Sequence, residues 1–229
     1  HRRGPDSAFA HWALKGIDGT IGRIWRAASR SAMRDYDLWI YADHGQEKTT
    51  PYADVTGRSL EEACREALAE EGLDVAVESP PDEPTRASLM KGAEAVRRLV
   101  TGEDEHDEDH DAHHADLTHM GPVGHLYLPD RPDDDVLERV ARRLTRDAGI
   151  PAVGAVTADG TPWLWSAGRR LRLPDEADRY LADTPWAAEA SADLAGLVAH
   201  DDAGTFTLFG WAPDRLPLSF AAEHGSHAG

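Results

Sequence analysis

The stretch Tyr36-Asp37-Leu38-Trp39-Ile40-Tyr41-Ala42-Asp43-His44-Gly45-Gln46 is the starting point for the fold of this chain. Residues 38–41 are almost wholly apolar, with aromatic and β-branched side chains, and so predict a buried strand. Asp43 and His44 would then follow the end of that strand, where open α/β sheets bind ligands. An adjacent carboxylate and imidazole can both ligate a divalent ion, and Gly45 lets the backbone turn away. A plain turn after the strand is the alternative interpretation.

Length and composition exclude several classes of protein. The chain has 229 residues, enough for one large domain or two small ones with a substantial core. A formal charge of −18 argues against a nucleic-acid-binding surface, because a phosphate backbone needs a basic face. The single cysteine, Cys64, excludes an intrachain disulfide framework, and its helical surroundings indicate a core thiol. We expect no membrane span, because no run of about 18 apolar residues occurs.

The first hundred residues alternate between helical and extended patterns. Apolar residues at three- and four-residue steps predict a helix over residues 10–28. Ser59 and Glu62 form a capping box that opens a second helix, and Gly72 ends it. Residues 73–77 predict a strand and residues 84–100 a further helix.

Residues 102–116 are dominated by Asp, Glu and His and have no apolar period. Such a segment cannot bury a core, so we expect a disordered surface insertion. Weak binding of transition metals is the alternative, although no ligand spacing fixes a coordination geometry.

A second organised region begins near Gly121. The apolar patterns predict strands and helices in alternation, with a helix that has acidic residues in its first turn and Gly149 after its end. The predicted elements are a strand over 123–128, a helix over 133–147, a hairpin of 152–156 with 163–165, short helices within 175–197, and strands over 206–209 and 218–221.

Metal-ligating residues occur in three places: His1, the pair Asp43 and His44, and either His224 or His227. The last two groups each follow a predicted strand, so we expect both to project from one sheet edge, where a two-metal site can form. No phosphate-binding Gly-x-x-x-x-Gly-Lys-Ser/Thr loop and no Gly-x-Ser-x-Gly nucleophile elbow occurs.

Three short motifs in this order resemble the type I phosphodiesterase/nucleotide pyrophosphatase branch of the alkaline phosphatase superfamily. His1-Arg2-Arg3-Gly4-Pro5-Asp6-Ser7 looks like the segment that begins at a ligand histidine and contains Gly-Pro. Ala42-Asp43-His44-Gly45 looks like the Ser-Asp-His-Gly motif, whose Asp and His bind metal. Glu223-His224-Gly225-Ser226-His227-Ala228-Gly229 looks like the closing Gly-x-His-Gly motif, an alignment that selects His227 as the ligand.

The resemblance implies a fold and a chemistry. The fold would be α/β, a three-layer α/β/α sandwich of the alkaline phosphatase type, incomplete, with an inserted smaller α+β region. Residues 1–100 would be part of the hydrolase core, residues 101–118 the acidic insertion, and residues 119–229 an α+β region that returns to the core. Two divalent ions, with zinc expected, would be held by His1 and His227 and by Asp43 and His44 around a small phosphoester substrate.

This chain departs from the family pattern in the groups that lie upstream of the first motif. The family's nucleophilic Thr or Ser and its first metal-binding Asp have no counterpart here, so we expect a bacterial fragment that is inactive alone. A non-catalytic relative of the same fold and a metal-sequestering protein are the alternatives. The resemblance is compatible with an extracytoplasmic or membrane-associated location, for which the sequence offers no targeting segment.

Overall fold

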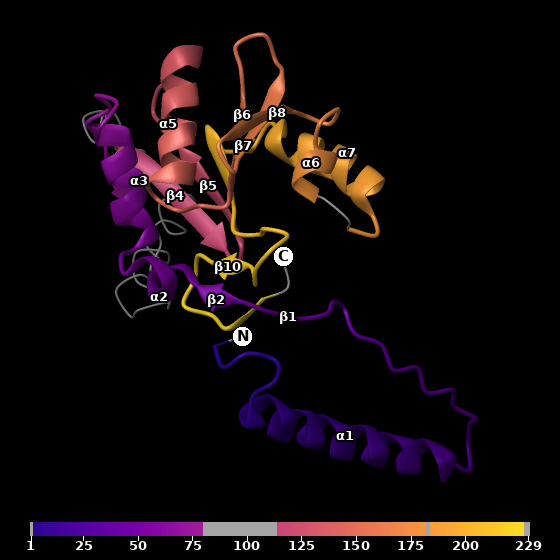
Figure 1. The fold of residues 1–229 in the computed structure, drawn as a ribbon. Coiled ribbons are helices and arrows are strands. Elements are labelled where there is room, and N and C mark those ends of the chain that lie inside the picture. Colours follow the sequence, from indigo (N-terminus) through magenta and orange to yellow (C-terminus); the bar gives the residue numbers. More distant parts are fainter. Residues whose placement is uncertain (1, 80–113, 182–183, 227–229) are drawn as a thin grey trace, which may run out of the picture.

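A computed structural model describes residues 2–79, 114–181 and 184–226 (Figure 1). The predicted helix over 84–100 and most of the acidic segment lie outside these residues. The helices are α1 (Ala8–Ser29), α2 (Tyr52–Thr56), α3 (Leu60–Ala69), α5 (Asp134–Arg146), α6 (Asp178–Leu181) and α7 (Ala187–Val198). The strands are β1 (Glu47–Lys48), β2 (Thr50–Pro51), β3 (Ala76–Glu78), β4 (His114–Met120), β5 (Val123–Tyr127), β6 (Ala152–Val156), β7 (Pro162–Ser166), β8 (Arg169–Arg172), β9 (Phe206–Phe209), β10 (Leu218–Ser219) and β11 (Gly225–Ser226).

One sheet of seven strands dominates the fold, in the order β3-β4-β5-β9-β6-β7-β8. The β3–β4 pair is parallel, and every other pair in this sheet is antiparallel. Two short pairs lie beside it, an antiparallel β1–β11 and a parallel β2–β10. The predicted hairpin forms as β6 and β7, whose register places Gly154 opposite Leu164.

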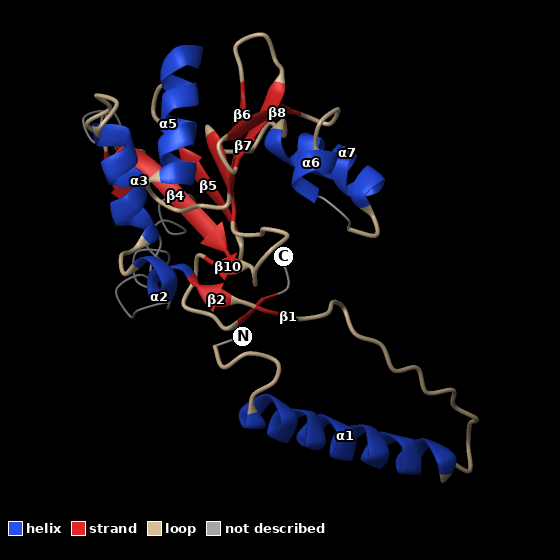
Figure 2. Cartoon of the chain, in the orientation of Figure 1, coloured by secondary structure: helices blue, strands red, loops and turns tan. Residues whose placement is uncertain are grey.

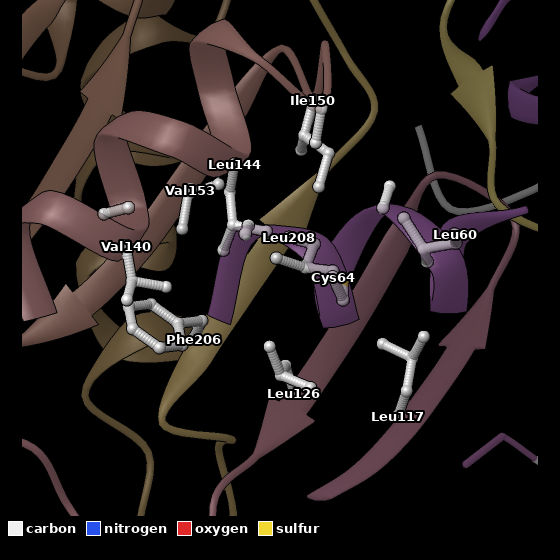
Figure 3. Close-up of a cluster of buried hydrophobic side chains, with 14 of the residues drawn as sticks. Leu60, Cys64, Leu117, Leu126, Val140, Leu144, Ile150, Val153, Phe206 and Leu208 are labelled. Atoms are coloured by element: carbon white, nitrogen blue, oxygen red, sulfur yellow. The ribbon is translucent and has the colours of Figure 1, made fainter. Parts of the chain in front are cut away.

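Helices cover both faces of the sheet (Figure 2). Apolar side chains of α3 and α5 pack on one face, where Cys64 and Leu144 meet strand residues such as Leu117, Leu126 and Phe206 (Figure 3). On the other face, α6 and α7 pack on the β6–β9 half of the sheet, and Val198 lies against Gly154. The layers are therefore helix, sheet and helix, because the two faces of β6 contribute alternate residues to different clusters.

The local signals in this region predict the element boundaries well. Ser59 accepts a hydrogen bond from the Glu62 amide, and the Glu62 carboxylate accepts one from the Ser59 amide, so the capping box is confirmed. Gly72 and Gly149 both have positive φ values, 77° and 72°, as expected for residues that end helices. Cys64 is a fully buried core thiol, as predicted.

The N-terminal part of the chain is different, because none of residues 2–48 is buried. Helix α1 forms over the predicted range, capped by the Ser7 hydroxyl, but its apolar stripe is exposed, with Ile17 at 56% and Trp25 at 55%. Figure 1 shows α1 and the long connection that follows it running beside the rest of the molecule rather than within it.

The prediction of a buried strand over residues 38–41 is wrong. This segment is extended but pairs with no strand among the described residues, and Trp39 and Tyr41 are 84% and 89% exposed. An apolar run specifies a buried strand only where a neighbouring strand can take up its backbone hydrogen bonds. Asp43 and His44 accordingly precede β1 and do not follow a strand of a parallel sheet.

Two further boundaries differ from the sequence predictions. Residues 114–116, assigned to the acidic insertion, begin β4, because Ala115 and Leu117 alternate inward and are fully buried. The strand predicted over 73–77 forms later, as β3, and the strand predicted over 218–221 is reduced to β10. Residues 52–78 and 115–220 share one hydrophobic cluster, so these parts of the chain pack together across the acidic segment.

Candidate metal centre

Two of the predicted motifs are joined by the β1–β11 pair. In its antiparallel register Glu47 lies opposite Ser226 and Lys48 opposite Gly225. Thr49, which is 2% exposed, holds the segment after His44 against residues 223–224. Its amide donates to the His224 carbonyl at 3.1 Å, and its hydroxyl donates to the Glu223 carbonyl at 2.9 Å. The segment after His44 and the segment before residue 227 are thereby held side by side.

The surroundings of Gly225 show that the first motif, residues 1–7, also lies beside the β1–β11 pair. A Cβ atom added to Gly225 would lie 3.0 Å from Pro5 Cδ, 3.2 Å from Gln46 Cδ and 3.2 Å from Gly4 Cα. Such distances are shorter than the 3.5–4.0 Å or so at which carbon atoms pack, so a larger residue here would require these neighbours to move. Gly4 in turn has a φ of 74° and lies against the His224 carbonyl, where a Cβ would come within 2.8 Å of the oxygen.

All three motifs therefore meet around β1 and β11. Figure 1 shows the two ends of the described chain close together at this point. Sequence reasoning identified the motifs but attached no role to Gly4, Thr49 or Gly225, which bring them together. Gly225 carried a usable signal, since a glycine inside a ligand motif often marks a close approach of two backbones.

Asp43 and His44 have the geometry of a ligand pair. His44 Nδ1 lies 2.8 Å from the Gly45 carbonyl oxygen, and Asp43 Oδ1 accepts the His44 amide at 3.0 Å. In the tautomer whose Nδ1–H donates to this carbonyl, Nε2 carries the lone pair of the ring. Nε2 lies 3.7 Å from Asp43 Oδ2, close to the roughly 3.4 Å that separates two ligand atoms of a tetrahedral zinc ion. This donor set therefore fits a divalent ion.

Two of the four predicted ligands lie within the residues that the structure describes. Asp43 and His44 are adjacent on an exposed loop, whereas His1 and His227 lie outside the described residues. Among the described residues, no group of three or more His, Cys, Asp or Glu side chains is placed to hold a metal ion. What the structure brings together is the chain on either side: Gly4, three residues after His1, touches Gly225, two residues before His227.

A cavity of about 240 Å³ lies beside these motifs, between α2, the start of α3 and the chain after β10. His224, His119 and Glu61 are among its lining residues. Burial raises the pKa of Glu61, but hydrogen bonds from the Ser79 hydroxyl, from its own backbone amide and from the Ser59 side chain outweigh this effect and hold the pKa below its ordinary value. Carboxylate and imidazole side chains thus line the space next to the motif at residues 223–229.

A comparison with known families shows the family of the chain. The model of the family described as "Type I phosphodiesterase / nucleotide pyrophosphatase" matches residues 1–175, well over half of the chain. The chain therefore belongs to the type I phosphodiesterase/nucleotide pyrophosphatase family. This is a family of phosphoric-ester hydrolases that typically bind two metal ions. The match includes the first two motifs but ends before the motif at residues 223–229.

Searches of curated proteins and of solved structures found no match. The family assignment thus rests on the family match alone. The motifs and their contacts indicate which residues to consider as metal ligands. The described helices are all too short or too polar to cross a membrane.

Proposed function

We propose that this chain forms the metal-binding part of a two-metal phosphoesterase site, with Asp43 and His44 on one ion and His1 and His227 on the other. The observation that carries the proposal is the contact of three motif segments at Gly225, whose missing Cβ leaves room for Gly4, Pro5 and Gln46. A site that takes ligands from all three motifs requires these segments, which are far apart in sequence, to lie side by side in this way.

The chemistry of the proposed site follows from its donors. Two divalent ions, expected to be zinc, would lower the pKa of a nucleophilic hydroxyl and neutralise the phosphoryl charge during an in-line displacement. His44 is oriented for binding because its Nδ1 is engaged with the Gly45 carbonyl, and Asp43 supplies a carboxylate oxygen on the same side. The substrate would be a small phosphoester, and the preference for diesters is part of the proposal.

We further propose that the nucleophilic Thr or Ser and the first metal-binding Asp lie outside residues 1–229, in an element that covers α1 and the segment after it. The support is the concentration of exposed apolar side chains there, including Trp12, Ile17, Trp25 and Trp39. Exposed apolar surface on this scale marks a contact with another part of a protein. The fold as a whole would then be a three-layer sandwich of the alkaline phosphatase type, with the observed seven-stranded sheet as its smaller region.

A zinc titration of the purified chain tests the ligand assignment. We expect Asp43→Asn and His44→Gln each to weaken the tightest zinc site at least tenfold. The matched controls Asp37→Asn, on the same exposed segment, and His11→Gln, on α1, should leave it unchanged. Zinc affinity that survives both ligand substitutions would contradict the assignment.

The same titration separates the site from the metal-sequestering alternative. Deletion of residues 103–111 removes most of the carboxylates of the acidic segment together with His106 and His110, but none of the proposed ligands. We expect the deletion to remove weak sites only. If it abolished the tightest site, metal sequestration by that segment would be the better account.

A further inference from the structure

The turn between β4 and β5, formed by Gly121 and Pro122, lies against the chain that leads to the last metal motif. The Pro122 carbonyl accepts a hydrogen bond from the Gly210 amide at 2.7 Å, and the Gly121 carbonyl accepts one from the Phe220 amide at 2.7 Å. Figure 1 shows the end of β4 directed at β10, which directly precedes Phe220. Backbone hydrogen bonds therefore join the seven-stranded sheet to the residues before the motif at 223–229.

Ser226, the last residue of β11, packs against the same turn. Its side chain is buried, and a Cβ atom added to Gly121 would lie 1.9 Å from Ser226 Oγ and 3.0 Å from Ser226 Cβ. The space left by the missing side chain of Gly121 is thus the space that Ser226 occupies. The Ser226 hydroxyl has no hydrogen-bond partner among the described residues, so this contact depends on the fit of the two residues.

Strand β11 is therefore held from two sides. Successive residues of a strand face opposite sides, and the two residues of β11 contact different parts of the chain. Gly225 lies against Gly4 of the first motif, whereas Ser226 lies against the β4–β5 turn. His227 is the next residue in the sequence. The sheet, and not the first motif alone, thus fixes the backbone that leads to this histidine.

We propose that Gly121 and Ser226 are positioning residues, which place His227 at the second ion of the proposed metal centre. The inference rests on the proposed function, because His227 is a ligand only there. A metal ligand has to lie within about 0.2 Å of its ideal distance from the ion, so a displaced Ser226 would carry His227 out of range. His44 lies on an exposed loop three residues before β1, so its ion should be affected much less.

A zinc titration of the full chain, followed by NMR of the histidine rings, tests the proposal. We expect the His227 signal, assigned from His227→Gln, to shift with zinc in the wild-type chain. Gly121→Ala should raise the zinc concentration at half this shift about tenfold or more, the usual loss when a group that orients a ligand is disturbed. The His44 signal of the same samples should respond at nearly the wild-type concentration, whereas a general structural defect would move both signals.

A matched control separates the contact from backbone strain. Gly121 has a φ of 55°, where any added side chain also strains the backbone. Gly160, in the turn between β6 and β7, has a φ of 82°, but a Cβ added there meets nothing within 4 Å. Gly160→Ala therefore adds comparable strain without the collision, and we expect it to leave both histidine responses unchanged.

A second substitution at Ser226 shows whether the effect passes through this contact. Ser226→Gly removes the side chain with which an alanine at position 121 would collide. We expect the double variant Gly121→Ala with Ser226→Gly to respond to zinc as Ser226→Gly alone does. If Gly121→Ala proves unfolded, Ser226→Val decides instead, because it enlarges the same contact from a two-residue strand, and it should weaken the His227 response in the same way.

The outcomes distinguish this inference from the proposed function. A wild-type His227 response in Gly121→Ala would overturn the inference and leave the proposed ligands intact. A double variant as weak as Gly121→Ala would do the same, because the loss would not then depend on Ser226. If the His227 signal of the wild-type chain does not respond to zinc, the second ion of the proposed function is wrong, and this inference falls with it.

Discussion

Replacement of Gly225 by alanine should separate the three motifs without unfolding the domain. The added methyl would lie 3.0 Å from Pro5 Cδ and 3.2 Å from Gly4 Cα, so these atoms must move by about 0.5–1 Å to reach ordinary packing distance. The Gln46 side chain, at 3.2 Å, can rotate away, but the Gly4–Pro5 backbone cannot move without shifting the loop.

The size of the effect follows from what surrounds this loop. Overpacking of this kind costs about 1–3 kcal/mol where the structure cannot yield. Here residues 2–48 contain no buried side chain, so the loop can yield. We therefore expect a loss of global stability below about 1 kcal/mol and a loss of zinc affinity of about tenfold or more, because the segment that carries His1 is displaced.

Thermal unfolding and zinc titration of the same samples measure both quantities. Gly45→Ala is the matched control, since a Cβ there meets nothing within 4 Å, and it should leave stability unchanged. Wild-type zinc affinity in Gly225→Ala would refute the reasoning, because the contact at Gly225 would then have no bearing on metal binding.

Other predictions concern the fold. Hydrogen bonds from two arginines of α5 lower the pKa of Glu71, so its stabilisation is complete above its ordinary pKa near 4.5 and is lost as the pH falls through the lower folded value; Glu71→Gln should flatten the decline of the unfolding free energy in acid, and an unchanged pH profile would contradict this. Burial raises the pKa of the Cys64 thiol to about 12, so we expect no reaction with a thiol reagent until the chain unfolds, and rapid labelling of the native chain would be inconsistent with the core. Ile17→Ala on the exposed stripe of α1 should change the unfolding free energy by less than about 0.5 kcal/mol, whereas Leu68→Ala, which is fully buried, should cost about 2–5 kcal/mol; equal losses would show that α1 is buried in solution.

The sequence was informative where local chemistry determines the structure. The Ser59–Glu62 capping box, the glycines at 72 and 149 and the apolar stripe of α5 all predicted elements that formed close to the expected residues. Each of these signals acts within one element, so no knowledge of its neighbours was needed.

Predictions that depended on neighbours were less successful. Residues 38–41 have the composition of a buried strand, but burial depends on a partner strand that the described chain does not provide. The sequence also could not predict that most strand pairs are antiparallel, because the direction of pairing depends on how distant segments meet. For the candidate site, the motifs predicted the ligands, and only the structure showed that Gly4, Gln46 and Gly225 come into contact.

The most direct test of the metal centre is anomalous diffraction at the zinc edge from crystals of the zinc-loaded chain. The proposal predicts a peak about 2.0–2.2 Å from Asp43 Oδ2 and His44 Nε2, and a second peak bound by His1 and His227. Peaks confined to the acidic segment at residues 103–116, or no peak near Asp43, would contradict it.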